Sequence, residues 1–239
     1  MPAERFYHPQ PFLEGSSITL EEQEFHHLIH VMRARQGDDI ELVNGQGQLA
    51  KACIDAIEKK RASLTLSQVE TFPPSTTQLI LAQAVPRLNR LEFILEKSTE
   101  LGATEIWLFP GAHSERNNFS ENQLERLNTI LIAAMKQCGR FYLPKLVLMP
   151  PIKKWSQVPS SAFYGDTSPL APSLAASWNL SGNKQSAFIC IGPESGFNAE
   201  EESALKNLGV LGVKLHPNIL RTDTAAITAL AILSHSLFS

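Results

Sequence analysis

The spacing of hydrophobic residues changes once along the chain, near residue 72. Before that point apolar and polar residues mostly alternate, a period of two that is typical of half-buried β-strands. This pattern predicts strands over 39–44, 48–57 and 62–69, and the Asn-Gly-Gln-Gly segment at 44–47 predicts a hairpin turn between the first two. The first part of the chain is therefore expected to be a small β-barrel-like domain.

One helix is predicted within this part, over residues 25–32, where apolar residues recur at helical spacing after an acidic first turn. His26 and His30 stand on it at the i, i+4 spacing that metal ligands can use. No third ligand is evident, and no Glu stands in the HExxH position. We interpret both histidines as surface or packing residues and expect no metal site.

The segment 71–76, Thr-Phe-Pro-Pro-Ser-Thr, predicts an extended linker, because its two prolines disfavour both helix and central strand. After it, short apolar runs alternate with helical patterns, which is typical of a parallel sheet covered by helices on both faces. The runs predict strands at 78–85, 105–109, 146–149, 162–165, 187–191 and 210–215, and the helical patterns lie at 91–101, 120–138, 199–207 and 223–237. The sequence thus predicts two domains, 1–72 and 73–239, the second with an α/β fold.

Composition and charge narrow the class of protein. The chain has 239 residues, of which 43% are hydrophobic, and a net charge of −3. This composition excludes a wholly disordered chain, and no apolar run reaches the roughly 18 residues that a membrane helix needs. The first residues lack the apolar segment of a secretory signal, and the three cysteines form no CxxC motif. We expect a cytoplasmic protein without membrane contact.

The basic residues are unevenly distributed. Lysines and arginines recur from Arg126 to Lys154, and no acidic residue occurs between Arg126 and Asp166. A local basic face on an otherwise acidic protein fits contact with a phosphate backbone at one place. A chance fluctuation in a stretch of low charge accounts for the pattern equally well.

Two loops follow predicted strands and lead into helices, the position at which ligands bind in parallel α/β sheets. The first is Ile-Gly-Pro-Glu-Ser-Gly-Phe at 191–197, whose glycines let the backbone approach a ligand closely. It matches neither a dinucleotide fingerprint nor a P-loop, which disfavours a nucleotide-dependent oxidoreductase. A tight turn without a ligand is the structural alternative.

The second loop, 215–226, carries two unusual features. Ile219 and Leu220 are apolar in a connection that is usually polar, and Arg221 stands at a helix start, which is predicted to be buried and where the helix dipole disfavours a cation. An anionic ligand or a partner carboxylate would account for the arginine. The helix that follows is apolar nearly all round over 224–233, which predicts that it is buried.

Both loops resemble the cofactor loops of SPOUT-class methyltransferases, and the similarity is greatest to the RsmE family of 16S ribosomal RNA uridine-N3 methyltransferases. Further stretches of this chain match that family in the same order. They are RFYH at 5–8, His27 with VMR at 31–33 and GD at 37–38, KSTELG at 97–102, SER at 114–116 and QCGR at 137–140. The chain departs from the family's usual residues at Lys136, Ser195, His216 and Asn218. The number and order of the motifs make the resemblance specific.

The resemblance implies a fold, a cofactor and partners. The first domain is expected to be a PUA-like RNA-binding β-barrel, and the second a SPOUT domain with a trefoil-knotted parallel sheet. The cofactor would be S-adenosylmethionine, and the substrate 16S ribosomal RNA, either free or in an assembled small subunit. Enzymes of the family work as homodimers. The alternative is a non-catalytic RNA-binding protein that uses the same barrel and basic face.

The resemblance also assigns residues to roles. Contacts with the cofactor are expected from Gly192, Pro193, Glu194, Gly196, Leu215, Ile219, Leu220, Thr222 and Thr224. Contacts with RNA are expected from Arg5, Arg33, Arg116, Gln137, Arg140 and Lys145. For Arg140 the structural alternative is a solvated helix end.

Two residues are candidates for catalysis. Uracil N3 carries a proton, so an enzyme that methylates it must stabilise a developing uracil anion. Arg221 is the candidate for that charge, and Glu194 is the candidate base or partner of the cofactor ammonium group. A loop cap that satisfies backbone amides is the structural alternative for Glu194.

Overall fold

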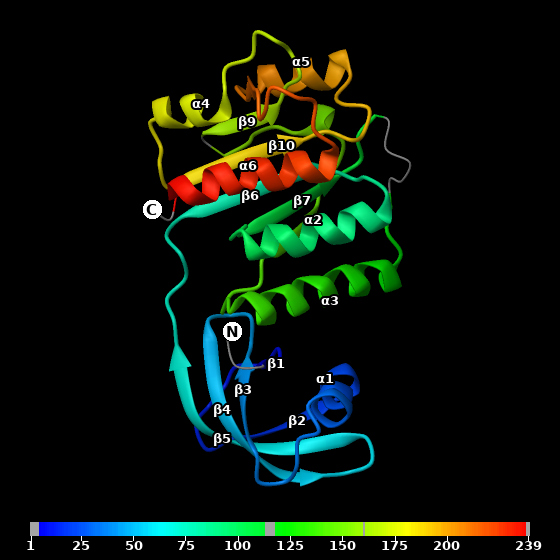
Figure 1. Ribbon diagram of the computed structural model, residues 1–239, viewed down its shortest axis with the longest axis vertical. Helices are drawn as coiled ribbons and strands as arrows, with labels where there is room; N and C mark the ends of the chain where they lie inside the picture. Colours follow the sequence, from blue (N-terminus) through cyan, green and yellow to red (C-terminus); the bar gives the residue numbers. More distant parts are fainter. Residues whose placement is uncertain (1–4, 113–117, 160, 238–239) are drawn as a thin grey trace. The chain divides into compact units, whose positions relative to one another are not determined.

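The computed structural model describes residues 5–112, 118–159 and 161–237, and the chain in it forms two compact units (Figure 1). One unit contains Met1–Pro74 together with Ile132–Leu143, and the other contains Ser75–Leu131 and Pro144–Ser239. The long helix α3 (Glu121–Cys138) therefore contributes its first part to one unit and its last turns to the other.

The first unit is built on a five-stranded sheet in the order β1-β3-β4-β5-β2. The strands are β1 (Arg5–Tyr7), β2 (Ser17–Glu21), β3 (Asp39–Val43), β4 (Gln48–Ile57) and β5 (Arg61–Thr71). β1 pairs with β3 in parallel, and the other pairs are antiparallel. Two register shifts interrupt the β4–β5 ladder, and such bulges bend and twist a sheet. The three predicted strands are confirmed, whereas β1 and β2 were not predicted.

The predicted helix of this unit is confirmed only in part. α1 (Glu22–His26) is α-helical, but the next turn, η1 (His27–Val31), is a π-helix. The wider turn is visible where Met32 N donates to His27 O at 3.0 Å. Leu28 of this turn is fully buried, and Phe25 and Ile29 pack against the same core, but Met32 is exposed. The apolar spacing therefore marked most of the buried face correctly but not the helix type.

The segment 132–143 is held to the first unit by backbone and ring contacts. Gly47 N donates to Phe141 O at 2.9 Å, and Tyr142 Oη donates to Phe72 O at 2.8 Å. The rings of Phe72 and Phe141 stack with their centroids 3.8 Å apart. Phe72, at the start of the proline-containing linker, is thus held in place by these contacts. The composition of the linker alone did not indicate this.

The second unit is a six-stranded parallel sheet in the order β11-β9-β10-β6-β7-β8, as predicted for an α/β fold. Its strands are β6 (Gln78–Ala84), β7 (Glu105–Phe109), β8 (Lys145–Leu148), β9 (Ala162–Gly165), β10 (Ser186–Ile191) and β11 (Leu211–Val213). The helices, besides α3, are α2 (Leu88–Glu100), η2 (Ile152–Lys154), α4 (Leu174–Leu180), α5 (Ala199–Asn207) and α6 (Thr222–Leu237). η2 and α4 were not predicted.

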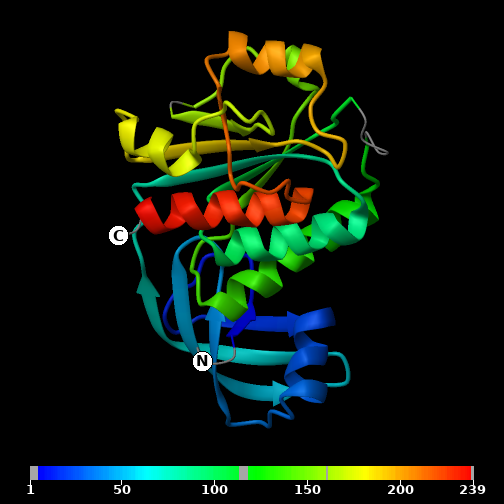
Figure 2. The same cartoon turned by 45° about the horizontal axis from the view of Figure 1, so that its top comes forward.

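Helices cover both faces of this sheet. α6 packs on β6 and β10 with α2 beside it (Figures 1 and 2), and α5 and η2 cover the other face. Successive side chains of a strand point to opposite faces of the sheet. On β6, Ala82 and Ala84 therefore pack in one core cluster with Leu205 of α5. Gln83, between them, points to the other face and donates a hydrogen bond to Thr222 of α6. In the part of the chain that the structure describes, no helix is long and apolar enough to cross a membrane.

The first turn of α3 confirms a capping box. The spacing of Ser120 and Gln123 predicts it, since a Ser and a Gln three residues apart can satisfy each other's backbone amides. Ser120 N donates to Gln123 Oε1 at 3.0 Å, and Gln123 N donates to Ser120 Oγ at 3.3 Å. The helix start is therefore fixed by its own sequence.

Candidate functional site

A cavity of about 300 Å³ opens at the carboxyl ends of β9, β10 and β11. Because these strands are parallel, the loops that follow them meet at one edge of the sheet. The lining comes from three such loops, within 165–169, 192–197 and 214–220, and from the first turn of α6. The two loops that the sequence singled out are thus brought together by the fold.

The glycines of the first loop fit tight backbone packing. A Cβ on Gly192 would lie 3.3 Å from the carbonyl carbon of Gly196 and 3.3 Å from Phe197 N. Gly196 has φ +77°, in the left-handed region that favours glycine, and its N–H donates to Pro193 O at 2.9 Å. The loop is a closed turn whose backbone forms one wall of the cavity.

Thr222 joins the two loops through its hydroxyl group. The residue is only 5% exposed. Its Oγ1 donates to Gly192 O at 2.8 Å and accepts from Gln83 Nε2 at 3.0 Å. Gln83 is fully buried, and its Oε1 has no hydrogen-bond partner. Thr222 therefore holds the glycine loop in place as well as lining the cavity.

Replacing Thr222 by valine is expected to destabilise the protein by about 2 kcal/mol, because the half-buried Gly192 O loses its hydroxyl donor and the buried Gln83 Nε2 keeps only Ala84 O as an acceptor. Denaturant unfolding measures the change. Thr224→Val is the matched control, since Thr224 lies in the same helical turn but is exposed, and a surface change of this kind stays within about 0.5 kcal/mol. Equal losses in the two variants would contradict the linking role of Thr222.

Glu194 lines the cavity and forms an ion pair with Arg90 of α2. Its Oε1 lies 3.6 Å from Arg90 Nη1, with side-chain exposures of 38% for Glu194 and 26% for Arg90. A pair this exposed contributes little to stability. Its geometry does, however, place a carboxylate at the cavity wall with one cationic neighbour.

Two predicted residues do not line the cavity. Arg221 immediately precedes α6 and its carbonyl accepts from Ala225 N at 2.7 Å, but the residue is exposed. The expectation of a buried helix start is correct for Thr222 and wrong for Arg221. Thr224 is also exposed. The predicted residues that line the cavity are Gly192, Pro193, Glu194, Gly196, Leu215, Ile219, Leu220 and Thr222.

The third loop was missed in the sequence. It contributes Asp166, Thr167 and Pro169 to the lining. Asp166 Oδ1 accepts from Ser168 N at 2.7 Å, which fixes the carboxylate at the start of the loop. The segment has no glycine motif, but it follows a predicted strand, and a search of every strand end in the parallel sheet would have found it.

The residues predicted to contact RNA differ in how exposed their side chains are. Arg5 is 12% exposed, and its guanidinium contacts Glu41 and Gly139 O at 3.0 Å each. Arg140 is half-buried, and burial lowers the pKa of its guanidinium. Arg33, Gln137 and Lys145 are exposed, while Arg116 lies outside the described residues. RNA contact stays a prediction for these residues, and it has least support for Arg5.

Three cations of the basic stretch are ion-paired. Arg126 pairs with Glu92 at 2.6 Å, Lys136 pairs with Glu24 at 2.6 Å, and Lys153 pairs with Glu200. Each of these acids comes from a distant part of the sequence. Acids from elsewhere in the sequence therefore neutralise part of the basic stretch, while Lys145 and Lys154 remain exposed.

The pair of histidines in the first unit packs ring against ring. The rings of His26 and His30 lie 4.6 Å apart between centroids. Among the residues that the structure describes, no three His, Cys, Asp or Glu side chains are grouped so that they could hold a metal ion.

Comparison with known proteins identifies the family. A model of an RNA methyltransferase domain matches residues 73–234, and a model of an RNA methyltransferase PUA domain matches residues 20–67. The ribosomal RNA small subunit methyltransferase E of Bacillus subtilis is 27% identical, with 95% of this chain and 93% of that protein covered. The protein of the same name from Synechocystis is 30% identical, with 93% and 74% covered.

Solved structures agree with these matches. A methyltransferase from Legionella pneumophila in complex with S-adenosylmethionine is 26% identical, with a TM-score of 0.87 and 98% of each chain covered. A ribosomal RNA small subunit methyltransferase E from Neisseria gonorrhoeae, bound to S-adenosylmethionine, is 28% identical with a TM-score of 0.81, and 96% of this chain and 95% of that chain are covered. The chain belongs to the ribosomal RNA small subunit methyltransferase E family of RNA methyltransferases and carries that family's PUA domain.

Proposed function

We propose that this protein transfers a methyl group from S-adenosylmethionine to N3 of a uridine in 16S ribosomal RNA. The observation that carries the proposal is the cavity at the ends of β9, β10 and β11, which is built from the two loops that resemble the family's cofactor loops. Relatives of this chain bear the name ribosomal RNA small subunit methyltransferase E, and solved structures similar to it contain S-adenosylmethionine.

The lining of the cavity fits this cofactor. Leu215, Ile219 and Leu220 offer an apolar wall for the adenine ring, and the Asp166 and Glu194 carboxylates offer acceptors for ribose hydroxyls and an ammonium group. At Gly192 a Cβ would be crowded by the backbone of Gly196 and Phe197. An apolar wall facing a few acceptors is the lining that such a ligand requires.

The chain's own residues have separate tasks in the proposed reaction. The bound cofactor supplies an electrophilic methyl group. Arg221 is exposed and does not line the cofactor cavity, so its guanidinium is available to a substrate that enters from solvent. A cation there stabilises negative charge that develops on the uracil oxygens when N3 loses its proton. The Glu194 carboxylate is the acceptor at the cavity wall that can take this proton or bind the cofactor ammonium.

We also propose the trefoil knot of the SPOUT class for the second domain, 73–239, preceded by the PUA-like domain over 1–72. In support, β11 lies at the edge of the sheet while α6, which follows it, returns across β10 and β6. The bond from Thr222 to Gly192 brings the second loop against the first. A crystallographic trace of 191–222 tests the threading.

Nucleoside mass spectrometry of ribosomal RNA tests the function. Cells that lack the protein are expected to lose 3-methyluridine from 16S ribosomal RNA, and the wild-type gene is expected to restore it. A variant that cannot bind the cofactor should not restore it. Unchanged 3-methyluridine in the deletion strain would favour the alternative of a non-catalytic RNA-binding protein.

The homodimer is a further part of the proposal. Ala226, Ala229 and Leu230 of α6 are buried within the chain, whereas Ala231 is exposed. Sedimentation is expected to give a dimer at micromolar concentration, and Ala231→Arg is expected to give a monomer, because a long charged side chain would enter the contact. A monomeric wild-type protein would contradict this arrangement.

RNA binding is expected to weaken with each lost phosphate contact. Arg33→Ala and Lys145→Ala should each flatten the plot of log affinity against log salt concentration by about 0.7 to 0.9 units. Cofactor affinity should not change. Lys59→Ala, another exposed cation, is the matched control, and filter binding over a salt series makes the comparison. Slopes equal to that of the control would remove both residues from the RNA contact.

A further inference from the structure

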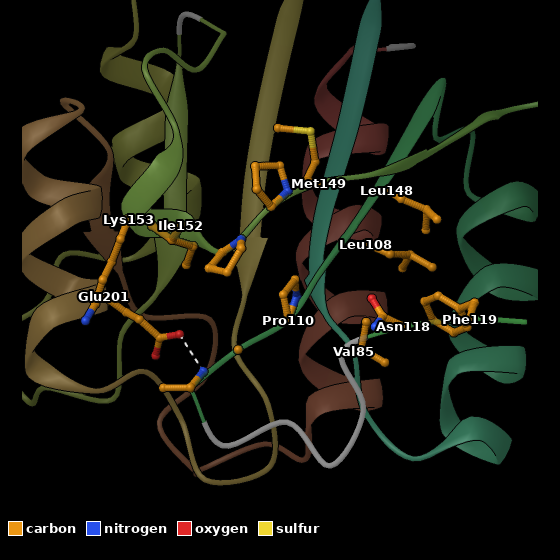
Figure 3. A pocket seen from close by; sticks show the side chains of 14 residues that line it. Val85, Leu108, Pro110, Asn118, Phe119, Leu148, Met149, Ile152, Lys153 and Glu201 are labelled. Carbon is orange, nitrogen blue, oxygen red and sulfur yellow. Dashed lines mark hydrogen bonds between the residues drawn. The ribbon is translucent and has the colours of Figure 1, made fainter.

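A second and larger cavity, of about 800 Å³, lies at the carboxyl ends of β6, β7 and β8 (Figure 3). Val85 follows β6, Leu108 belongs to β7, and Leu148 is the last residue of β8. In Figure 3 these three side chains lie together with Asn118 and Phe119 on one side of the cavity, and Glu201 and Lys153 lie on the other. The cofactor site proposed above uses none of these residues.

The two cavities are neighbours along one edge of the sheet. Gln83 of β6 pairs in register with Ile191 of β10. Ile191 lines the smaller cavity, and Val85, two residues beyond Gln83, lines the larger one. The loop that ends the smaller cavity at Phe197 leads directly into α5, whose Glu201 lines the larger one. The linings of the two cavities therefore meet at the carboxyl ends of β6 and β10.

The lining of the larger cavity selects against phosphate. Its lining residues are mostly apolar, and two of them are charged: Lys153, whose ammonium pairs with Glu200, and Glu201, which is only 4% exposed. Both of its oxygens are engaged, since Oε1 accepts from Ala112 N at 2.8 Å and Oε2 accepts from Asn198 N at 3.0 Å. A carboxylate fixed in this way repels an anion and cannot turn away from it. An uncharged ring fits the cavity better than a phosphate group does.

Two side chains suit recognition of a base. Phe119 offers a half-buried ring on which a base can stack. Asn118 offers an amide with both donors and an acceptor, which matches the carbonyl and N–H groups on the edge of a pyrimidine. Lys154, at the end of η2, is exposed, so a phosphate group can meet a cation outside the cavity.

We propose that this larger cavity receives the target nucleotide after its base has left the RNA stack. The proposal rests on the function proposed above and adds the place where the substrate binds. Enzymes that act on one atom of a base either use a single-stranded substrate or take the base out of the stack, and they hold it in a pocket. The volume exceeds what one uracil needs, which leaves space for its ribose and a neighbouring base.

Filling the cavity tests the proposal. Leu148→Trp is expected to lower kcat/KM for RNA by about 100-fold, because a displaced base misses the reacting geometry. Cofactor affinity by calorimetry should not change. Leu211→Trp is the matched control, since both leucines lie at strand ends and are 50% and 47% exposed, but Leu211 lines neither cavity. Equal kcat/KM for the two variants would overturn the proposal.

A second measurement avoids substitutions altogether. In methyl NMR of the wild-type protein, uridine 5′-monophosphate is expected to shift the signals of Leu108, Leu148 and Ile152, and S-adenosylmethionine those of Ile219 and Leu220. Shifts by the cofactor alone, with none from the nucleotide at saturating cofactor, would overturn the nucleotide site and leave the proposed function standing. Absence of the cofactor shifts would count against the proposed function itself.

Discussion

Gly196→Asp is expected to abolish S-adenosylmethionine binding, with a rise in Kd of at least about 100-fold, or roughly 2.7 kcal/mol. Gly196 has φ +77°, which strains any residue with a Cβ. No protein atom lies within 4 Å of the position that the Cβ would take, and Gly196 lines the cavity, so the added carboxylate would occupy space proposed for the cofactor. Calorimetry with the cofactor measures the loss directly.

The chain supplies a matched control for this variant in Gly209. Its φ is +78°, and the space around its Cβ position is equally open. Gly209 lies before β11, at the amino end of the strand and thus at the opposite edge of the sheet from the cavity. Gly209→Asp should show a similar loss of stability and normal affinity for the cofactor. Normal affinity in Gly196→Asp would instead show that the cofactor binds elsewhere.

Much of the second unit could be predicted because its signals are local. A buried parallel strand is a short apolar run, and β7 (Glu105–Phe109), β9 (Ala162–Gly165) and α5 (Ala199–Asn207) begin and end where the pattern predicts. The cavity loops could be predicted for the same reason, since glycines and misplaced apolar residues follow predicted strands. The pattern within one segment is enough to predict a structure when a regular topology, such as a parallel sheet, determines which segments lie next to it.

The features that were missed depend on distant contacts. Lys136 departs from the family's usual residue, and its Nζ lies 2.6 Å from the carboxylate of Glu24, which also accepts from Tyr7 N. The π-helical turn at His27–Val31 likewise places Leu28 in a core formed by residues from distant strands. The spacing of residues within one segment does not predict which distant acid a lysine will pair with or which core a leucine will pack into.

Arg221→Ala is expected to lower the turnover of methyl transfer by about 100-fold to 1,000-fold, the usual cost of removing one group that stabilises a developing anion. RNA affinity should fall little, and cofactor affinity should not change, because Arg221 does not line the cofactor cavity. Single-turnover methylation at saturating RNA measures the effect. Arg221→Lys should restore part of the rate, because the positive charge remains. The recovery should be incomplete, because a lysine lacks the planar guanidinium group that can donate two parallel hydrogen bonds.

The assignment of charge stabilisation to Arg221 depends on which arginine or lysine variant loses turnover at saturating RNA. Lys206→Ala removes an exposed cation that pairs with Glu202 at 3.5 Å, outside both cavities, and should turn over normally. Arg140→Ala should lose affinity for RNA but keep its turnover once RNA is saturating, as expected for a group that binds the substrate and its transition state equally. If Arg140→Ala lost turnover and Arg221→Ala kept it, the catalytic arginine would be Arg140, and Arg221 would have only a structural role before α6.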